Sequence, residues 1–568
     1  MRPSRRGHRP GIRARRVVAA LSAATLAVGL AAGCSSESQV PSIGYATDAV
    51  IATYNGGTTI GWASGSPALF GRVLTGFFYT GPDGQQVADT DVGTAKEVPG
   101  EAQTIQYRLS PDGVYSDGIA TSCDDLVFTW AARSGRFTRD GAPLFDSAST
   151  AGYEEIERID CEPGSKDATV VFRPGRRYVP WRTLFAAGEL MPAHVATQAT
   201  GVTNLIGAVR SGELVALGKL ADFWNTGWTM TPGALDASRF PSAGPYRIGS
   251  YSESEGLVLV ANERWWGAKP ETGRIVLWPK GTDLAEKIGA NAVGVIDIGA
   301  GSVPELSLDG FSASTVPGRG AEQLVLATGG VFAGVQPRRA LAACVPRQAL
   351  FDTLGSVPER PERGLGSGML NAHIIQQDSL FYGAATGAAQ QYAAVNPAAP
   401  GGANLTVRIG YRTPDDRRAA TVRAIADSCR AAGITVVDAG APDFQPTRLA
   451  EGAVDAVLAG TAAAVGPAGS TTEVAAVSAL RTGNGSNVGR FGNGRFDAIT
   501  DQLAADDASA AQLGLLTEAE NLLWSELPSI PLFATPRLIA FGTGLQNGVA
   551  GPTQAGTGWN MDRWRLTR

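Results

Sequence analysis

The sequence predicts an α/β fold with a parallel sheet, and the segment 403–460 is the clearest evidence for it. Residues 405–409 form an apolar, β-branched run typical of a strand, and similar runs follow at 434–437 and 453–458. Between the first two runs, apolar residues recur at helical spacing: Val422, Ile425, Ala426 and Cys429. Gly433 then stands where a helix C-cap is expected. Strands that alternate with helices pair in parallel, so this segment indicates a parallel sheet.

Length and composition indicate more than one domain. A chain of 568 residues is too long for a single hydrophobic core, so two or three domains are expected. A hydrophobic content of 44% is typical of a globular protein, while 72 Gly and 33 Pro indicate many turns and long connections. The region 60–190 has Gly-Pro and Asp-Gly turns, with strands expected at 103–109, 153–159 and 168–173 and a helix near 123–134.

The first 34 residues predict export and a lipid anchor. Seven arginines precede an uncharged apolar run at 17–33, and the run ends in Ala-Ala-Gly before Cys34. A cysteine at that point, followed by polar residues, is typical of a bacterial lipoprotein, in which the Cys34 thiol is lipidated (palmitate is one such acyl group) and the signal peptide 1–33 is removed. The alternative is an ordinary secretory signal with an incidental cysteine. Either general secretion or twin-arginine export fits the pair Arg15-Arg16. Residues 34–42 are expected to form a tether.

The charge balance argues against nucleic acid as a partner. The whole chain has a formal charge of −5, which falls to −12 once the seven arginines of residues 1–33 are removed. Phosphate backbones require clustered Lys and Arg, so an acidic exported protein fits them poorly. Only His194 and His373 remain beyond the signal, and no nucleophile motif accompanies them. We therefore expect no catalytic residues, no metal and no cofactor.

Four cysteines besides Cys34 are an even number in an exported protein, which favours disulfide bonds. They are Cys123, Cys161, Cys344 and Cys429, and three connectivities exist. Cys123–Cys161 and Cys344–Cys429 are favoured because each pair lies within one expected domain. Four free buried thiols are the alternative.

Residues that follow the strands are the candidate ligand-binding residues, because parallel sheets bind ligands beyond the carboxyl ends of their strands. A first strand is expected from 44 to 55, so Tyr54 and Asn55 stand at its end, before a Gly/Thr loop. Arg412 follows the strand at 405–409, and Gly460 and Thr461 follow the strand at 453–458. These five residues form the predicted site.

Four groups of motifs then occur in order along the chain. They are YRL at 107–109, VYSDG at 114–118 and DDLVFTW at 124–130; GPYR at 244–247 and NERWWG at 262–267; PRRAL at 337–341; and GRFD at 494–497, EAE at 518–520 and PSIPLF at 528–533. Together they resemble solute-binding protein family 5, the peptide-binding lipoproteins of ABC importers. Dipeptide-permease-type members from actinobacteria are the most similar in pattern.

The resemblance implies a two-lobed, periplasmic-binding-protein-like (type II) clamp with an extra strand-rich subdomain in the first lobe. The first lobe is expected at 43–285, the second at 286–519, and a C-terminal return to the first lobe at 520–568. The implied protein is a monomer held on the outer face of the cell membrane by its lipid. It would capture a peptide or peptide-like solute and pass it to ABC permease subunits, without catalysis.

One departure from the family bears on the ligand. Peptide-binding members carry an Asp after the strand equivalent to 455–460, and it pairs with the α-amino group of the peptide. Here no carboxylate follows until Glu473. A buried ammonium needs a charged partner, so clamping of a free amine is in doubt. The alternatives are an envelope lipoprotein with a regulatory or scaffolding role in cell-wall glycolipid synthesis and, less favoured for lack of His, a haem or nickel-chelate binder.

Overall fold

The structure is a computed structural model that describes residues 41–233, 235–399, 404–461, 470–506, 508–551 and 553–567. The expected signal peptide, the lipidated Cys34 and most of the tether lie outside this range. Within it, no helix combines the length and apolar character needed to cross a membrane.

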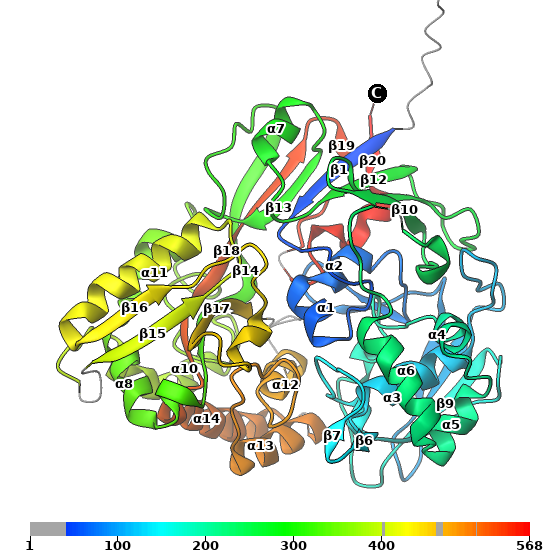
Figure 1. The fold of residues 1–568 in the computed structure, drawn as a ribbon, viewed down its shortest axis with the longest axis horizontal. Helices are drawn as coiled ribbons and strands as arrows, with labels where there is room; N and C mark the ends of the chain where they lie inside the picture. The colour runs from blue at the N-terminus through cyan, green and yellow to red at the C-terminus, as the bar shows by residue number, and fades with distance from the viewer. Residues whose placement is uncertain are drawn as a thin grey trace, which may run out of the picture. The chain divides into compact units, whose positions relative to one another are not determined.

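A ten-stranded mixed sheet runs through the chain (Figure 1). Its strands, in spatial order, are β10 (Tyr246–Ser252), β11 (Gly256–Ala261), β12 (Arg274–Trp278), β1 (Ser42–Thr47), β13 (Val295–Gly299), β18 (Ser529–Gly542), β14 (Phe311–Leu326), β17 (Ala456–Thr461), β15 (Leu405–Gly410) and β16 (Ile434–Asp438). β1 pairs in parallel with β12 and β13, and β15 pairs in parallel with β16 and β17. The parallel pairing expected for 403–460 is therefore present, inside a mixed sheet in which β1 also pairs in parallel with its neighbours.

The two long strands β14 and β18 connect the two halves of this sheet. β13 pairs with the end of β18 at 537–541, whereas β17 pairs with the end of β14 at 321–326. The β14–β18 register shifts between Pro317 and Ala321, so that 318–320 bulges opposite Thr535. We propose that the two lobes meet at this break. The first lobe then extends past β13, beyond the boundary at 285/286 expected from the sequence, because β13 pairs with β1.

Around this sheet the first lobe carries the strand-rich subdomain. An antiparallel sheet contains β4 (Gly93–Val98), β5 (Thr104–Leu109), β9 (Asp167–Phe172) and β8 (Ile156–Asp160), and the small pairs are β2 (Phe78–Thr80) with β3 (Gln86–Ala88), β6 (Thr138–Arg139) with β7 (Ala142–Pro143), and β19 (Leu545–Gln546) with β20 (Arg565–Leu566). Its helices are α1 (Thr59–Ser64), α2 (Ser66–Phe70), α3 (Cys123–Arg133), α4 (Ala193–Thr200), α5 (Leu205–Ser211), α6 (Leu214–Thr226) and α7 (Leu284–Gly289). The helix and strands predicted in 60–190 are present, although the strand predicted at 153–159 begins only at Ile156, after a 3₁₀ turn.

The second lobe is mainly helical outside its strands. Its helices are α8 (Val335–Cys344), α9 (Arg347–Leu350), α10 (Tyr382–Ala385), α11 (Asp416–Cys429), α12 (Ser470–Ala479), α13 (Gly494–Ala505) and α14 (Ser509–Glu526). α11 buries Val422, Ile425 and Cys429, the face that the sequence predicted, while Ala426 is half-buried. Gly433 has φ +75°, the left-handed conformation expected of a C-cap glycine.

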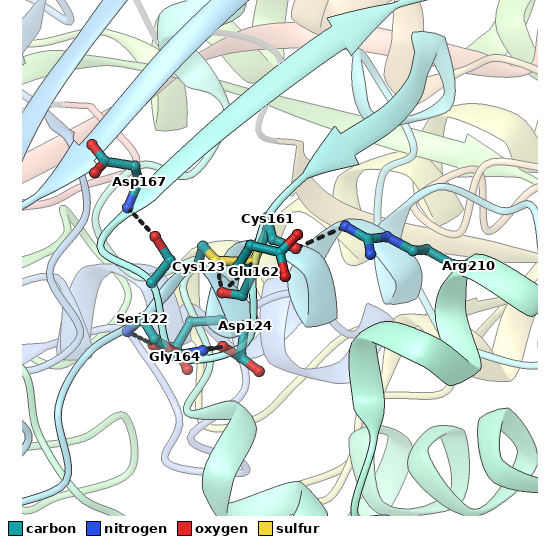
Figure 2. The surroundings of a disulfide bond; sticks show 10 residues. Ser122, Cys123, Asp124, Cys161, Glu162, Gly164, Asp167 and Arg210 are labelled. Carbon is teal, nitrogen blue, oxygen red and sulfur yellow. Dashed lines mark hydrogen bonds between the residues drawn. A yellow bond between two sulfur atoms is a disulfide. The ribbon is translucent and has the colours of Figure 1, made fainter.

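Two disulfides have the pairing that the sequence favoured. Cys123 is bonded to Cys161, and Cys344 is bonded to Cys429, with Cα–Cα distances of 6.0 Å and 4.9 Å. The first bond joins the start of α3 to the turn after β8 (Figure 2). There Asp124 accepts a hydrogen bond from the Gly164 N–H (2.7 Å), and Arg210 donates to the Cys161 carbonyl (2.8 Å). The second bond holds α8 against α11.

Removal of the second disulfide should destabilise the second lobe. The double substitution Cys344→Ala/Cys429→Ala opens a loop of 85 residues and should lower the free energy of unfolding by about 4 kcal/mol, mostly by increasing the entropy of the unfolded chain. Urea unfolding monitored by tryptophan fluorescence measures the loss. An unchanged urea midpoint would contradict a structural role for this bond.

Candidate ligand-binding cavity

A cavity of about 950 Å³ lies between the two lobes. From the first lobe, its walls include the residues directly after β1 (47–50), α1 and α2, and the loop 178–189. From the second lobe, they include Arg412 after β15, the loop 444–446, the strand β17 and the loop 486–489. The carboxyl ends of strands in both lobes thus face one space, as expected for a ligand site in α/β sheets.

The lobes also contact each other on the side of the cavity away from the β14–β18 break. The Ser486 N–H donates to the Ala148 carbonyl, and the Val179 N–H donates to the Ala504 carbonyl, both at 2.9 Å. Arg176 pairs with Asp501 at 3.1 Å, and Arg481 pairs with Glu154. Because both sides of the cavity are bridged, the arrangement is a closed one.

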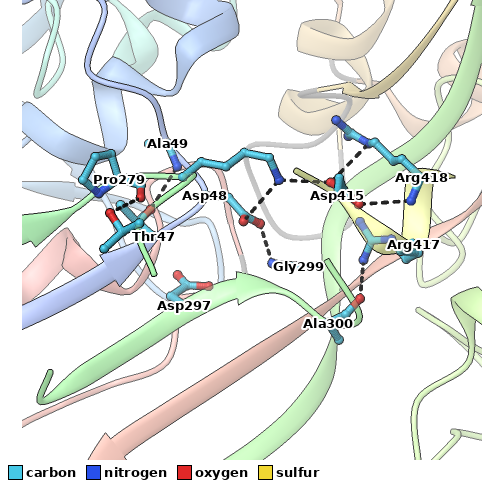
Figure 3. A network of polar contacts seen from close by, with 12 residues as sticks. Thr47, Asp48, Ala49, Pro279, Asp297, Gly299, Ala300, Asp415, Arg417 and Arg418 are labelled. Atoms are coloured by element: carbon cyan, nitrogen blue, oxygen red, sulfur yellow. Dashed lines mark hydrogen bonds and ion pairs between the residues drawn. The ribbon is translucent and has the colours of Figure 1, made fainter. Parts of the chain in front are cut away.

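Next to the break, charged residues lie together at the cavity wall (Figure 3). We name this group the hinge cluster; its members are Asp48, Lys280, Glu322, Asp415, Arg417 and Arg418. Lys280, which follows β12 in the first lobe, pairs with Asp415 at the N-cap of α11 in the second lobe (3.0 Å). Asp48 lies 3.9 Å from the same ammonium group and also accepts from the Gly299 N–H. Burial raises the pKa of Asp48, but Lys280 and Arg537 outweigh burial and lower it overall. The hinge cluster therefore joins the lobes through opposite charges.

Glu322 on β14 is the buried anion of this cluster. Its carboxylate accepts from Arg418 at 2.8 Å and pairs with Arg417 at 3.4 Å, and its side chain is 1% exposed. Burial alone raises the pKa of Glu322, yet the two guanidinium groups lower it below its usual value. Arg417 also donates to the carbonyl of Ala300 in the first lobe (2.8 Å). Glu322 thus holds α11 over the break.

Two further carboxylates in the wall are also neutralised by the protein. Asp297 on β13 accepts from Arg537 Nε (2.8 Å) and from the Thr557 N–H (2.7 Å). Glu189 pairs with Arg133 and accepts from the Tyr153 hydroxyl (2.8 Å). These groups stabilise the wall and leave little negative charge for a ligand.

A different part of the wall combines aromatic rings with unpartnered polar atoms. Tyr79 and Trp559 stack with ring centroids 6.1 Å apart. Nearby in the chain, the Thr553 hydroxyl and the Gln554 Oε1 are buried without a hydrogen-bond partner in the described part of the protein. Buried polar atoms are normally paired, so these two are candidates for contact with a bound molecule.

The structure does not place Tyr54 and Asn55 in the cavity wall, in contrast to the expectation. Both are fully buried in the first lobe. The Tyr54 hydroxyl donates to the Pro241 carbonyl (2.9 Å), and the Asn55 amide donates to the Trp224 carbonyl (3.0 Å) while its oxygen accepts from the Gly57 N–H (3.0 Å). The reason is that β1 ends at Thr47, eight residues before Asn55. The wall residue at the true strand end is Asp48.

Arg412 does line the cavity, half-buried, beside Phe444. Its Nε donates to the Phe444 carbonyl at 3.2 Å. Gly460 and Thr461 form the last two pairs of β17 with β14, opposite Glu322 and Ala321, so their backbone lies at the expected edge of the sheet.

Sequence reasoning also missed Lys280, Arg418 and Gln554. Lys280 follows the strand β12 and Asp48 follows β1, so the rule of strand ends applies to both and would have found them with correct strand boundaries. Gln554 lies in a loop near the C-terminus and had no local signal.

Comparisons with known proteins agree with the geometry. Residues 91–477 match the model of bacterial extracellular solute-binding proteins, family 5. The lipoprotein Rv2585c of Mycobacterium tuberculosis is 40% identical, and the match covers 100% of each chain. The oligopeptide-binding protein OppA of the same species is 25% identical over 84% of this chain and 77% of its own.

A solved structure, the oligopeptide-binding protein of Thermus thermophilus complexed with a pentapeptide, superimposes with a TM-score of 0.67. It is 17% identical, and the match covers 92% of this chain and 96% of that protein. The likeness extends over both lobes, so the expectation of a two-lobed, type II clamp is confirmed.

Glu322 offers a direct test of the hinge cluster. Glu322→Gln leaves two guanidinium groups in the wall without their carboxylate and should lower the free energy of unfolding at pH 7 by about 3–5 kcal/mol. Asp427→Asn is the matched control, because Asp427 pairs with Arg430 on the exposed surface, where we expect a change of about 0.5 kcal/mol at most.

The same comparison has a predicted pH dependence. The pKa of the Glu322 carboxyl is lower in the folded protein than in the unfolded chain. Its ionised form therefore stabilises the folded protein above the unfolded pKa, and this stabilisation is lost as the pH falls through the folded pKa. The difference between the parent and Glu322→Gln should therefore shrink below about pH 4. Urea unfolding between pH 7 and pH 3 measures it, and a difference that grows toward acid would contradict the account.

Proposed function

Because this chain belongs to family 5 of the bacterial extracellular solute-binding proteins, we propose that it captures a peptide or peptide-like solute for an ABC importer. It would act as a monomer outside the cytoplasmic membrane, anchored by the lipid on Cys34, and would catalyse no reaction. Its relatives are named lipoproteins, which fits such an anchor. Two or three acyl chains, at about 0.8 kcal/mol per buried CH₂, would hold it more firmly than one.

The observation that carries the proposal is the closed cavity with walls from both lobes. A solute inside it would contact both lobes, and separation of the lobes at the β14–β18 break would open the cavity. Solute binding and lobe closure would then be the same event, in which contacts made only in the closed form supply the affinity. A permease could distinguish loaded from empty receptor by this closure.

Arg412 is the side chain that we assign to ligand contact from the predicted set, with backbone groups at Gly460 and Thr461. Gln554 joins them from the structure. The charged and polar groups lie in a wall that is mostly apolar, so the cavity suits a solute that has both polar and apolar groups. The alternative of a regulatory or scaffolding role in glycolipid synthesis would require neither a cavity between the lobes nor charged groups in its wall.

Native mass spectrometry of the full-length protein, extracted from membranes in mild detergent, tests the proposal. We expect a non-covalent ligand series in the peptide mass range, and a mass increase on Cys34 that corresponds to acyl chains. Absence of any bound species, together with no thermal shift across a peptide library, would contradict solute capture.

A further inference from the structure

We propose that the solute is an organic anion without a free ammonium group, a peptide-like carboxylate with a blocked amino end, and that Arg412 binds its negative charge. This inference rests on the proposed function and names the substrate class of the same cavity.

No carboxylate in the described wall is free to bind an ammonium group. The carboxylates that line it are Asp48, Glu189, Asp297 and Asp415. Each pairs with a cation of the protein: Asp48 and Asp415 with Lys280, Glu189 with Arg133, and Asp297 with Arg537. An ammonium group brought into the closed cavity would have to break one of these pairs or stay unpaired, and either is costly.

The sequence supports the same conclusion beyond the described wall. Residues 461–472, which follow β17, contain neither Asp nor Glu. The segment that leaves the end of this strand therefore supplies no carboxylate for an amine.

Arg412 is a cation without a carboxylate partner among the described residues. In the described part of the chain its one hydrogen bond is from Nε to the Phe444 carbonyl, and no carboxylate lies within 4.0 Å of it. Asp443, which directly precedes Phe444 in the chain, pairs instead with Arg448 at 2.7 Å. The two terminal nitrogens of Arg412 are thus available to a ligand.

The pKa directions separate Arg412 from the paired arginines of the wall. Neighbouring carboxylates raise the pKa of Arg418 and Arg537 despite burial. For Arg412, burial lowers the pKa, and Asp443 offsets this only in part. An anion beside Arg412 would supply the missing compensation, and a guanidinium can bind a carboxylate through two parallel hydrogen bonds.

A second unpaired cation adds to the positive surplus. Arg182 also lines the cavity and stacks over the ring of Trp181 at 4.5 Å, with no carboxylate partner among the described residues. The described wall therefore contains two unpaired guanidinium groups and no unpaired carboxylate. This balance favours an anion over a zwitterion or a cation.

The polar atoms near Trp559 indicate what the rest of the ligand contains. Gln554 and Thr553 present buried, unpartnered oxygens in the same cavity wall as the stacked rings of Tyr79 and Trp559. Amide groups, which are planar and donate hydrogen bonds, complement both features. A peptide-like chain with a blocked amino end has such amides and carries its only backbone charge at the carboxylate.

Isothermal titration calorimetry with the full-length protein tests the charge preference. The probe is a tetrapeptide library in four forms: free ends, N-acetylated acid, N-acetylated amide and free-amine amide. We expect the N-acetylated acid to bind at least tenfold more tightly than the other three. Equal or tighter binding of a form with a free amine would overturn the inference and leave the proposed function intact.

If no form binds, the solute that co-purifies with the protein decides. A solute with a carboxylate and no amine supports the inference, and one with a free amine overturns it. If no solute co-purifies either, the proposed function itself fails, and the inference fails with it.

Variants of Arg412 test its role. Arg412→Gln should weaken binding of the N-acetylated acid at least tenfold and should leave binding of the matching amide unchanged, while Arg412→Lys should retain part of the preference. Arg448→Gln is the matched control, because Arg448 lies over the ring of Phe444 and outside the cavity wall. Equal losses for acid and amide would mean that Arg412 only supports the fold.

Discussion

The pairing of β14 with β18 is the constraint on which the rest of the structure depends. In the described chain these two strands carry the sheet from one lobe to the other, and their ladder is broken only at 318–320 and Glu322. Gly318 is needed at the break, since a Cβ there would lie 2.8 Å from the Thr535 carbonyl oxygen and 2.8 Å from Arg537. The cavity lies beside this break, so its size depends on the relative orientation of the two halves of the β14–β18 ladder.

Charge holds the lobes together at that point, and this explains why the wall is rich in ions that are mostly paired within the protein. Glu322 on β14 and Asp297 on β13 are buried, and each needs guanidinium groups from another element: Arg417 and Arg418 from α11, and Arg537 from β18. Lys280 then bridges to Asp415 across the lobes. These ions compensate one another. The guanidinium groups that remain unpaired in the described wall, Arg412 and Arg182, therefore determine which solute charge the cavity accepts.

Local patterns predicted the β15–α11–β16–β17 region well, because its helix and its strands each have a clear periodicity. The first strand was predicted too long, since Ala49, Val50 and Ile51 continue the apolar run past Asp48; this error moved the predicted site from Asp48 to Tyr54 and Asn55. β14 could not be predicted, because Pro317 and two glycines interrupt a mostly polar first half. The Lys280–Asp415 pair joins residues far apart in the chain, so local patterns could not predict it, whereas the rule of strand ends correctly placed Arg412 in the cavity wall.

A crystal structure of the full-length protein with its co-purified solute tests the central claim most directly. The account predicts closed lobes and a solute in the cavity, with an anionic group about 3 Å from the terminal nitrogens of Arg412. It also predicts that the Lys280–Asp415 and Arg537–Asp297 pairs remain intact. A solute ammonium bound to Asp48 or Asp415, with Arg412 facing solvent, would contradict it.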